Sequence, residues 1–179
     1  MIMCIIVSVA AVLLDFATKR IVMANMSLFE SGEFIPGFLE FYYIRNDGAA
    51  WGMLDGSRWI FIVLSLAAIA VLPIVIYKYG KKHTLVGLSL SLMLGGAIGN
   101  MIDRTFYGEK LFGGSVVDFL HFQMKKFPIL NEGFPVFNVA DLCVTFGAFI
   151  MIIYLIFFDG SIFDFGKKEK TEASENDKN

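Results

Sequence analysis

The sequence predicts a membrane α-helical protein, with four transmembrane helices and a small antiparallel β platform on the extracytoplasmic side. Apolar residues make up 56% of the 179 residues and charged residues only 18%, whereas a soluble domain usually carries about 25% charged residues. The mean hydropathy is +0.66. Three uncharged runs of 17 to 19 residues occur at 59–77, 84–102 and 142–158, close to the ~20 residues that cross a ~30 Å hydrocarbon core.

The four spans are expected at about 1–26, 59–77, 84–102 and 138–158. The first apolar run is short enough to be the core of a signal peptide as well. No positive charge precedes it, and no small-x-small cleavage site follows it before Lys19. These two features favour a retained helix.

The loops predict the orientation of the spans. The 78–83 link carries three lysines and no acid, and the tail after Gly166 begins with Lys167 and Lys168. Because cytoplasmic loops carry an excess of Lys and Arg, both termini are expected in the cytoplasm and two long loops outside. Lys19 and Arg20 would then lie on the outer side, which counts mildly against this orientation.

A single membrane-embedded domain is expected over 1–165. The outer β region is placed at about 33–57 and 111–120, where runs rich in aromatic or apolar residues follow turn signals. Residues 166–179 hold eight charges and no large apolar side chain, so a disordered cytoplasmic tail is expected there.

Charge and cysteine content exclude other protein classes. Lys and Arg number 15 against 17 Asp and Glu, so no positive excess exists to bind nucleic-acid phosphates. Cys4 and Cys143 both lie in apolar runs, and we interpret them as buried thiols rather than a disulfide.

Four aspartates are expected at the outer ends of the spans, namely Asp15, Asp103, Asp118 and Asp141. An Asp at the centre of a membrane helix costs about 2.5–3.5 kcal/mol, so such residues usually have a partner or a function, and this argument weakens near the interface. Asp15 has Lys19 four residues later on the same helix face, and an ion pair accounts for it.

Asp103 lies in a polar cluster with Asn100 and Arg104 at the end of the third span. We interpret this cluster as a hydrogen-bonded scaffold that could also hold a substrate carbonyl. Gly96 and Gly99 precede it, and small residues at such spacing let another helix backbone approach closely.

Asp118 and Asp141 have no Lys or Arg within four positions. Two such carboxylates brought together in apolar surroundings share one proton and titrate as a pair. The ionised one can take a proton from water while the protonated one polarises a scissile carbonyl, as in aspartic proteases. Simpler roles stay open, because Asp141 or Asn138 could be a helix N-cap and Asp118 a solvated acid at a strand end.

Other chemistries find less support. His83 is expected to be solvated beside the lysines of the link, and His121 could orient Asp118, but one His is not a metal site. Neither a dinucleotide-type glycine pattern nor G-x-S-x-G occurs. A small membrane proton or ion carrier using intramembrane carboxylates is an alternative function, which the uncharged interiors of spans two to four disfavour. A non-catalytic adaptor docking through the outer sheet is another.

Five blocks, in order along the chain, resemble the bacterial lipoprotein signal peptidases (signal peptidase II). They are D-x-x-x-K from Asp15, N-D-G-A-A-W-G from Asn46, G-G-A-I-G-N-M-I-D-R ending at Arg104, V-V-D-F around Asp118, and F-N-V-A-D ending at Asp141. Each block is weak alone, but all five in order are very specific, and they cover about residues 11–145.

The resemblance implies an intramembrane aspartic endopeptidase of the bacterial cytoplasmic (inner) membrane. Its substrate would be a diacylglyceryl-modified prolipoprotein, cleaved at the outer face just before the lipidated cysteine. Asp118 and Asp141 carry over as the catalytic pair. The substrate-binding or supporting residues that carry over are Asp15, Lys19, Asn46, Gly48, Asn100, Asp103, Arg104, Asn138 and Ala140. No metal or organic cofactor is implied, and the expected partners are the lipid-modified precursor and membrane lipid, with no nucleic acid and a monomeric protein.

The chain also departs from the family pattern. Trp51 stands where Phe is common, and the gap between Asp118 and Asp141 is long, with Lys125 and Lys126 inside it. These departures leave the loop geometry over the site and the breadth of substrates open.

Overall fold

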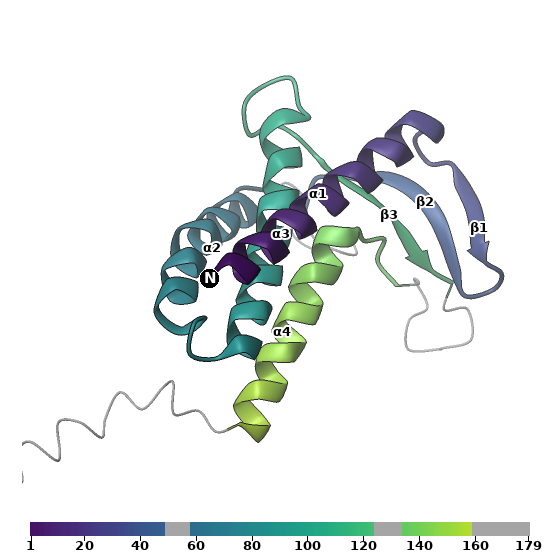
Figure 1. The fold of residues 1–179 in the computed structure, drawn as a ribbon. Helices are drawn as coiled ribbons and strands as arrows, with labels where there is room; N and C mark the ends of the chain where they lie inside the picture. Colours follow the sequence, from purple (N-terminus) through teal and green to yellow (C-terminus); the bar gives the residue numbers. More distant parts are fainter. Residues whose placement is uncertain (49–57, 124–133, 159–179) are drawn as a thin grey trace, which may run out of the picture.

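The computed structural model describes residues 1–48, 58–123 and 134–158. Within them, four helices and three strands follow one another along the chain (Figure 1). They are α1 (Ile2–Asn25), β1 (Ser31–Ile35), β2 (Leu39–Asn46), α2 (Arg58–Tyr79), α3 (Thr84–Phe106), β3 (Val116–Phe122) and α4 (Val139–Phe157). Each of these helices is long and apolar enough to cross a membrane. The predicted class, four membrane helices with a small antiparallel sheet, is confirmed.

The boundaries differ from the predicted ones by a few residues. α3 was expected to end at about 102 but continues to Phe106, because Asp103 and Arg104 are buried against neighbouring elements instead of marking the exit to water. β3 spans Val116–Phe122, so it occupies the end of the predicted 111–120 region and extends two residues beyond it. Trp51, the 49–57 part of the predicted β region, Lys125, Lys126 and the tail over 166–179 lie outside the described residues, and the division of the chain at 165 stays a prediction.

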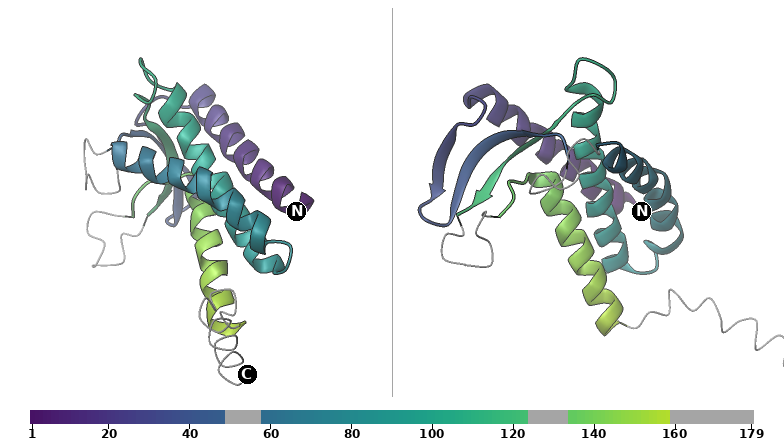
Figure 2. Two further views of the ribbon diagram at one scale, coloured as in Figure 1. Left: turned by 90° about the vertical axis from the view of Figure 1, so that its left-hand side faces the viewer. Right: turned by 180° about the vertical axis from the view of Figure 1, so that it is seen from behind.

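α3 is the central helix of the bundle and packs against α1, α2 and α4 (Figures 1 and 2). Its glycines allow this. A Cβ on Gly95 would lie 2.6 Å from the Cβ of Ala11 on α1, and a Cβ on Gly96 would collide with the carbonyl oxygen of Ala140 on α4. These two glycines of α3 therefore allow the backbones of α1 and α4 to approach it closely.

Buried hydroxyls also join the helices. Ser8 Oγ on α1 donates to the Ser91 carbonyl of α3 at 2.9 Å, and Ser89 Oγ on α3 donates to the Gly147 carbonyl of α4 at 2.7 Å. Because hydrocarbon offers no hydrogen-bond partner, these hydroxyls need such acceptors within the protein.

The sheet has the order β1-β2-β3, with both pairings antiparallel. Ile44 pairs with Asp118 and Asn46 with Val116, and the register shifts by a bulge between Phe41 and Ile44. An extra residue on β2 re-aims the side chains that follow it. The end of β2 that carries Asn46 therefore lies beside Asp118.

One face of the sheet packs against the end of α1. The buried cluster there consists of Val22, Tyr43, Val117 and Phe119. Since side chains alternate along a strand, burying Val117 and Phe119 against α1 turns Asp118 to the opposite face. That face looks toward the adjoining ends of α3 and α4.

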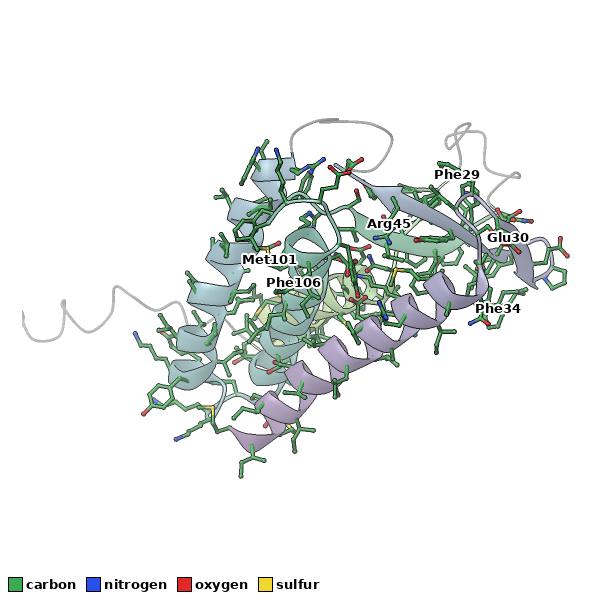
Figure 3. All side chains as sticks on the ribbon, turned by 90° about the horizontal axis from the view of Figure 1, so that it is seen from above. Phe29, Glu30, Phe34, Arg45, Met101 and Phe106 are labelled. Carbon is green, nitrogen blue, oxygen red and sulfur yellow. The ribbon has the colours of Figure 1, made fainter. Side chains whose placement is uncertain are left out.

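The far end of the sheet carries exposed aromatic residues. All five residues of β1 are exposed, and Phe29 and Phe34 are 64% and 57% exposed (Figure 3). Large apolar side chains gathered at a surface are typical of contact with a membrane or a partner. The expectation that the sheet lies on the membrane surface stays a prediction.

The opposite end of the bundle is closed by a second cluster. Its buried members are Cys4, Ile76, Val86, Leu90 and Tyr154. The Tyr154 hydroxyl lies 2.8 Å from His83 Nδ1, so the expectation that His83 is merely solvated is wrong, because α4 brings a phenol to its ring. Cys4 and Cys143 are both free thiols, as predicted, although Cys143 is only half-buried.

Candidate active site

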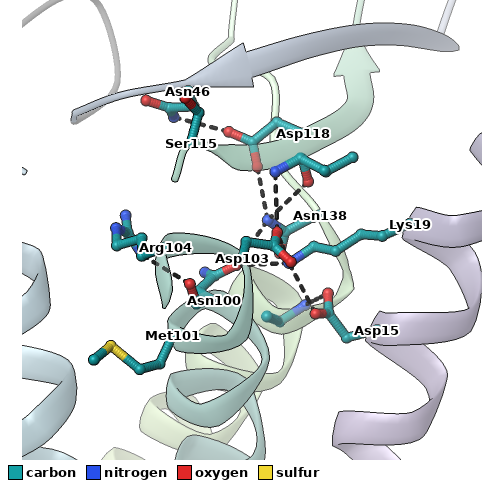
Figure 4. A network of polar contacts seen from close by, with 12 residues as sticks. Asp15, Lys19, Asn46, Asn100, Met101, Asp103, Arg104, Ser115, Asp118 and Asn138 are labelled. Atoms are coloured by element: carbon teal, nitrogen blue, oxygen red, sulfur yellow. Dashed lines mark hydrogen bonds and ion pairs between the residues drawn. The ribbon is translucent and has the colours of Figure 1, made fainter. Parts of the chain in front are cut away.

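Asp118 lies on β3 with only 2% of its surface exposed. Each carboxylate oxygen accepts one hydrogen bond from an amide. Asn46 Nδ2 donates to Oδ2 at 2.8 Å, and Asn138 Nδ2 donates to Oδ1 at 2.7 Å. Figure 4 shows these amides on either side of the carboxylate.

The surroundings of Asp118 favour its protonated form. Burial, with the negative charge of Asp141 as a second cause, raises the pKa of Asp118 from 3.8 to about 7, although the hydrogen bonds from Asn46 and Asn138 act in the opposite direction. Desolvation disfavours a charged carboxylate, and a like charge nearby adds to the effect.

Asp141 lies in the first turn of α4, three residues after Asn138. Asn138 Oδ1 accepts from Asp141 N at 3.0 Å, and Asp141 Oδ2 accepts from Asn138 N at 3.1 Å, which together form a capping box. Asn138 is therefore the N-cap, and the alternative that Asp141 is itself the cap is wrong. The remaining oxygen, Asp141 Oδ1, accepts from Asn100 Nδ2 at 2.8 Å.

Two asparagines bridge the two aspartates. Asn138 holds Asp118, Asn100 holds Asp141, and Asn138 Nδ2 donates to Asn100 Oδ1 at 3.0 Å. The structure thus brings together two carboxylates that lie 23 positions apart in the sequence. Asp118 is buried and Asp141 is half-buried, so the carboxyl group of Asp118 is the more shielded from solvent.

Lys19 lies beneath this pair with 1% of its surface exposed. Its Nζ lies 2.8 Å from Asp15 Oδ2 and 2.9 Å from Asp103 Oδ2, and it donates to Asn100 Oδ1 at 2.9 Å. The predicted ion pair with Asp15 is confirmed. The contact with Asp103 was missed, because it joins residues on two different helices and no local pattern indicates it.

Two backbone amides near the aspartates are also held by carboxylates. Val117 N donates to Asp103 Oδ2 at 3.0 Å, and Ala140 N donates to Asp15 Oδ1 at 2.9 Å. Ala140 is one of the predicted site residues. The structure gives it a backbone role, and Val117, which has the corresponding role on β3, was not named.

Asn46 and Gly48 lie at the end of β2. Gly48 N donates to Asn46 Oδ1 at 3.0 Å, which leaves the Asn46 amide group free to point at Asp118. The turn at 46–48 thus orients a site residue as well as ending the strand.

Arg104 is buried next to the two aspartates. Its guanidinium lies 5.3 Å from the centre of the Phe61 ring and makes a long, 3.5 Å contact with the Asn100 carbonyl. In the part of the chain that the structure describes, no carboxylate oxygen lies within 4.0 Å of it. Its side chain points away from Lys19, toward the opposite side of the site (Figure 4).

His121 does not orient Asp118. Its Nδ1 lies 2.6 Å from Glu40 Oε1, and Gln123 Nε2 donates to Glu40 Oε2 at 2.6 Å. The prediction is wrong because residues three apart on a strand point to opposite faces. Among residues 1–48, 58–123 and 134–158, no group of three His, Cys, Asp or Glu is placed to hold a metal ion, and the absence of a metal or cofactor stays a prediction.

Comparison with known proteins places this arrangement in a family. A family model described as signal peptidase (SPase) II matches residues 7–157. The chain belongs to the signal peptidase II family. It is 39% identical to a lipoprotein signal peptidase of Listeria monocytogenes serotype 4b over 150 residues, which are 84% of this chain and 90% of that protein. A lipoprotein signal peptidase of Bacillus pumilus is 40% identical over 151 residues, 84% of this chain and 90% of that protein.

Two solved bacterial membrane enzymes share the fold of this chain. A bacterial membrane enzyme determined by the in meso method at 2.3 Å resolution superposes with a TM-score of 0.75 and 32% identity, covering 92% of this chain and 93% of that one. A second, determined at 1.9 Å, gives a TM-score of 0.72 and 33% identity, covering 87% and 93%. The family, the four helices and the sheet therefore agree with the resemblance drawn from the five sequence blocks.

Proposed function

We propose that this chain is an aspartic endopeptidase that removes the signal peptide from diacylglyceryl-modified prolipoproteins, cleaving just before the lipidated cysteine. The family supports the reaction and the substrate class. The observation that carries the aspartic mechanism is the pairing of Asp118 with Asp141 through the amides of Asn138 and Asn100. Such a pair holds one proton between two acids.

The environments of the two acids suggest their roles. Burial and the charge of Asp141 raise the pKa of Asp118 to about 7, so Asp118 is the member of the pair that holds the shared proton below that pH. Protonated Asp118 then donates a hydrogen bond to the scissile carbonyl and stabilises the tetrahedral oxyanion. Asp141, which is half-buried, is the proposed base: it takes a proton from the attacking water and later delivers it to the leaving amine.

The polar neighbours bind or support the substrate. Arg104, a buried cation with no carboxylate within 4.0 Å in the described part of the chain, is placed to donate to peptide carbonyls. Asn46 and Gly48 line the β2 side, and Asn100 the α3 side. Asp15, Lys19 and Asp103 act from beneath as supports.

The proposed orientation places the reaction at the outer face of the bacterial inner membrane. The lysine-rich 78–83 link joins α2 to α3 at the end of the bundle away from the sheet, and positive loops face the cytoplasm. The termini are then cytoplasmic, and the exposed aromatics of β1 meet lipid. The protein is proposed to act as a monomer. No observation favours the alternative of a proton or ion carrier.

The test is cleavage of a lipidated precursor by purified protein in detergent. Asp118→Asn and Asp141→Asn are each expected to abolish turnover while the protein still inserts and purifies as the wild type does. Glu33→Gln, an exposed acid on the same sheet, is the matched control and is expected to leave turnover unchanged. Near-normal cleavage by either dyad variant would show that the acids are assigned wrongly.

A further inference from the structure

We infer that Lys19 is a positioning residue that aligns both aspartates of the dyad at once, through the peptide amides that immediately precede them. This inference deepens the proposed function and rests on it. It goes beyond the support expected from an ion pair within α1, because the Asp15–Lys19 pair alone would leave both dyad residues untouched.

The first connection runs through α3 to β3. Lys19 Nζ lies 2.9 Å from Asp103 Oδ2, and the same oxygen accepts the Val117 amide at 3.0 Å. Val117 immediately precedes Asp118. The Lys19 ammonium therefore positions the Asp103 carboxylate, and that carboxylate positions the peptide group next to Asp118.

The second connection runs within α1 to α4. Lys19 Nζ lies 2.8 Å from Asp15 Oδ2, and the other oxygen of Asp15 accepts the Ala140 amide at 2.9 Å. Ala140 immediately precedes Asp141. The two connections are equivalent, since each consists of one ammonium, one buried carboxylate and one backbone N–H before an aspartate.

The third connection reaches the side chains of the dyad. Lys19 Nζ donates to Asn100 Oδ1 at 2.9 Å. Asn100 Nδ2 holds Asp141 Oδ1 at 2.8 Å, and its Oδ1 also accepts from Asn138, the amide that holds Asp118. An ammonium has three N–H donors, so these three acceptors of the described chain account for all of them.

Burial gives this arrangement its rigidity. Lys19, Asp15 and Asp103 are each 1% exposed, and removing one partner of a buried ion pair leaves an uncompensated charge. A catalytic group displaced by about 1 Å can lose about a hundredfold in rate. Loss of Lys19 is therefore expected to displace both Asp118 and Asp141, although one lies on β3 and the other on α4.

Lys19 also acts on the dyad through its charge. The charged groups around Asp118 are Asp141 from α4, Arg104 and Asp103 from α3, and Asp15 and Lys19 from α1. Of these, Lys19 lowers the pKa of Asp118 and Asp141 raises it. Replacing Lys19 by a neutral side chain should therefore raise the pKa of Asp118 further, which a purely mechanical support would not do.

The experiment compares Lys19→Met with Ser8→Ala in detergent. Ser8 lies on the same helix and makes a buried bond to α3, but it does not touch the site. For Lys19→Met we expect kcat to fall about a hundredfold with KM for the lipidated peptide little changed, and the alkaline limb of the kcat–pH profile, where Asp118 loses its proton, to move to higher pH. Ser8→Ala should lose some thermal stability and keep the wild-type profile.

Hydrogen exchange provides a readout independent of catalysis. Asp103→Ala should speed exchange of the Val117 amide and leave that of Ala140 protected, and Asp15→Ala should do the reverse. Each variant leaves Lys19 paired with one acid, so both are expected to fold even if Lys19→Met does not. In Lys19→Met both amides should exchange faster.

Two results would overturn the inference. One is a Lys19→Met enzyme with wild-type kcat and pH profile, and the other is Asp103→Ala and Asp15→Ala proteins with unchanged exchange at both amides. Either result would leave the proposed function intact as long as Asp118→Asn and Asp141→Asn remain inactive. Activity in those two variants would instead contradict the proposed function itself.

Discussion

Asp118→Asn is expected to change how the stability of the protein depends on pH. Burial and the charge of Asp141 raise the pKa of Asp118 from 3.8 to about 7, so the folded protein binds a proton that the unfolded chain releases. At about 1.4 kcal/mol per pH unit, this difference corresponds to about 4 kcal/mol. The stabilisation is fully present below about pH 4 and is lost as the pH rises toward about 7.

Asparagine at position 118 cannot ionise, so the fall in stability between about pH 4 and pH 7 should be absent from the variant. The variant also has a drawback that does not depend on pH. Both oxygens of Asp118 can accept from Asn46 and Asn138 whether the acid is protonated or not, because a hydroxyl oxygen keeps an acceptor lone pair. An amide offers one oxygen and sets its own NH2 against the other donor. Leaving a buried donor unsatisfied costs about 1–3 kcal/mol. The variant should therefore be less stable than the wild type at pH 4 and gain on it steadily up to pH 8.

Unfolding in detergent, followed by tryptophan fluorescence or by a thermal shift at several pH values, measures this difference. Glu33→Gln, an exposed acid of the same sheet, is the control and should follow the wild-type curve. If Asp118→Asn and the wild type lost stability in parallel from pH 4 to pH 8, Asp118 would not hold the proton, and the roles given to the two acids would have to be exchanged or abandoned.

Two further perturbations test the packing around the site. Gly99→Ala places a Cβ 2.5 Å from Asp15 Oδ2, so cleavage activity and melting temperature should both fall. The expected loss of stability is about 1–3 kcal/mol. Gly32→Ala is the control and should change neither, because nothing lies within 4 Å of its new Cβ. Tyr154→Phe removes the bond to His83 and should lower the free energy of unfolding by about 1 kcal/mol; a matching fall in kcat would show that this end of the bundle communicates with the site.

The helices and the pairing of the acids were predictable because their causes are local or general. Uncharged runs of membrane length give the spans, and an acid with a lysine four residues later gives the Asp15–Lys19 pair. Asp118 and Asp141 stood out because no cation lies near them in the sequence. The five sequence blocks then indicated, through the resemblance to signal peptidase II, that Asp118 and Asp141 act as one pair.

The connections between elements were not predictable in the same way. Whether Lys19 reaches Asp103 depends on how α1 and α3 cross, and that crossing is set by Gly95 and Gly99 against α1. The partner of His121 depends on strand register, which a bulge in β2 shifts. Side-chain alternation along β3 alone places His121 on the face opposite Asp118, so the sequence is sufficient to separate these two residues.

The Asp15–Lys19 pair has a consequence for the biogenesis of the protein. Asn100 follows Lys19 by 81 residues, and at about 5–20 residues per second the ribosome needs roughly 4 to 16 s to reach it. Throughout that interval α1 must sit in lipid without its later neighbours. Because the two opposite charges lie 2.8 Å apart on one helix, the nascent segment carries its own counter-ion and enters the bilayer as a neutral unit. Moving either charge to the other side of α1 would leave both charges without a counter-ion during insertion, even if the completed bundle could neutralise them.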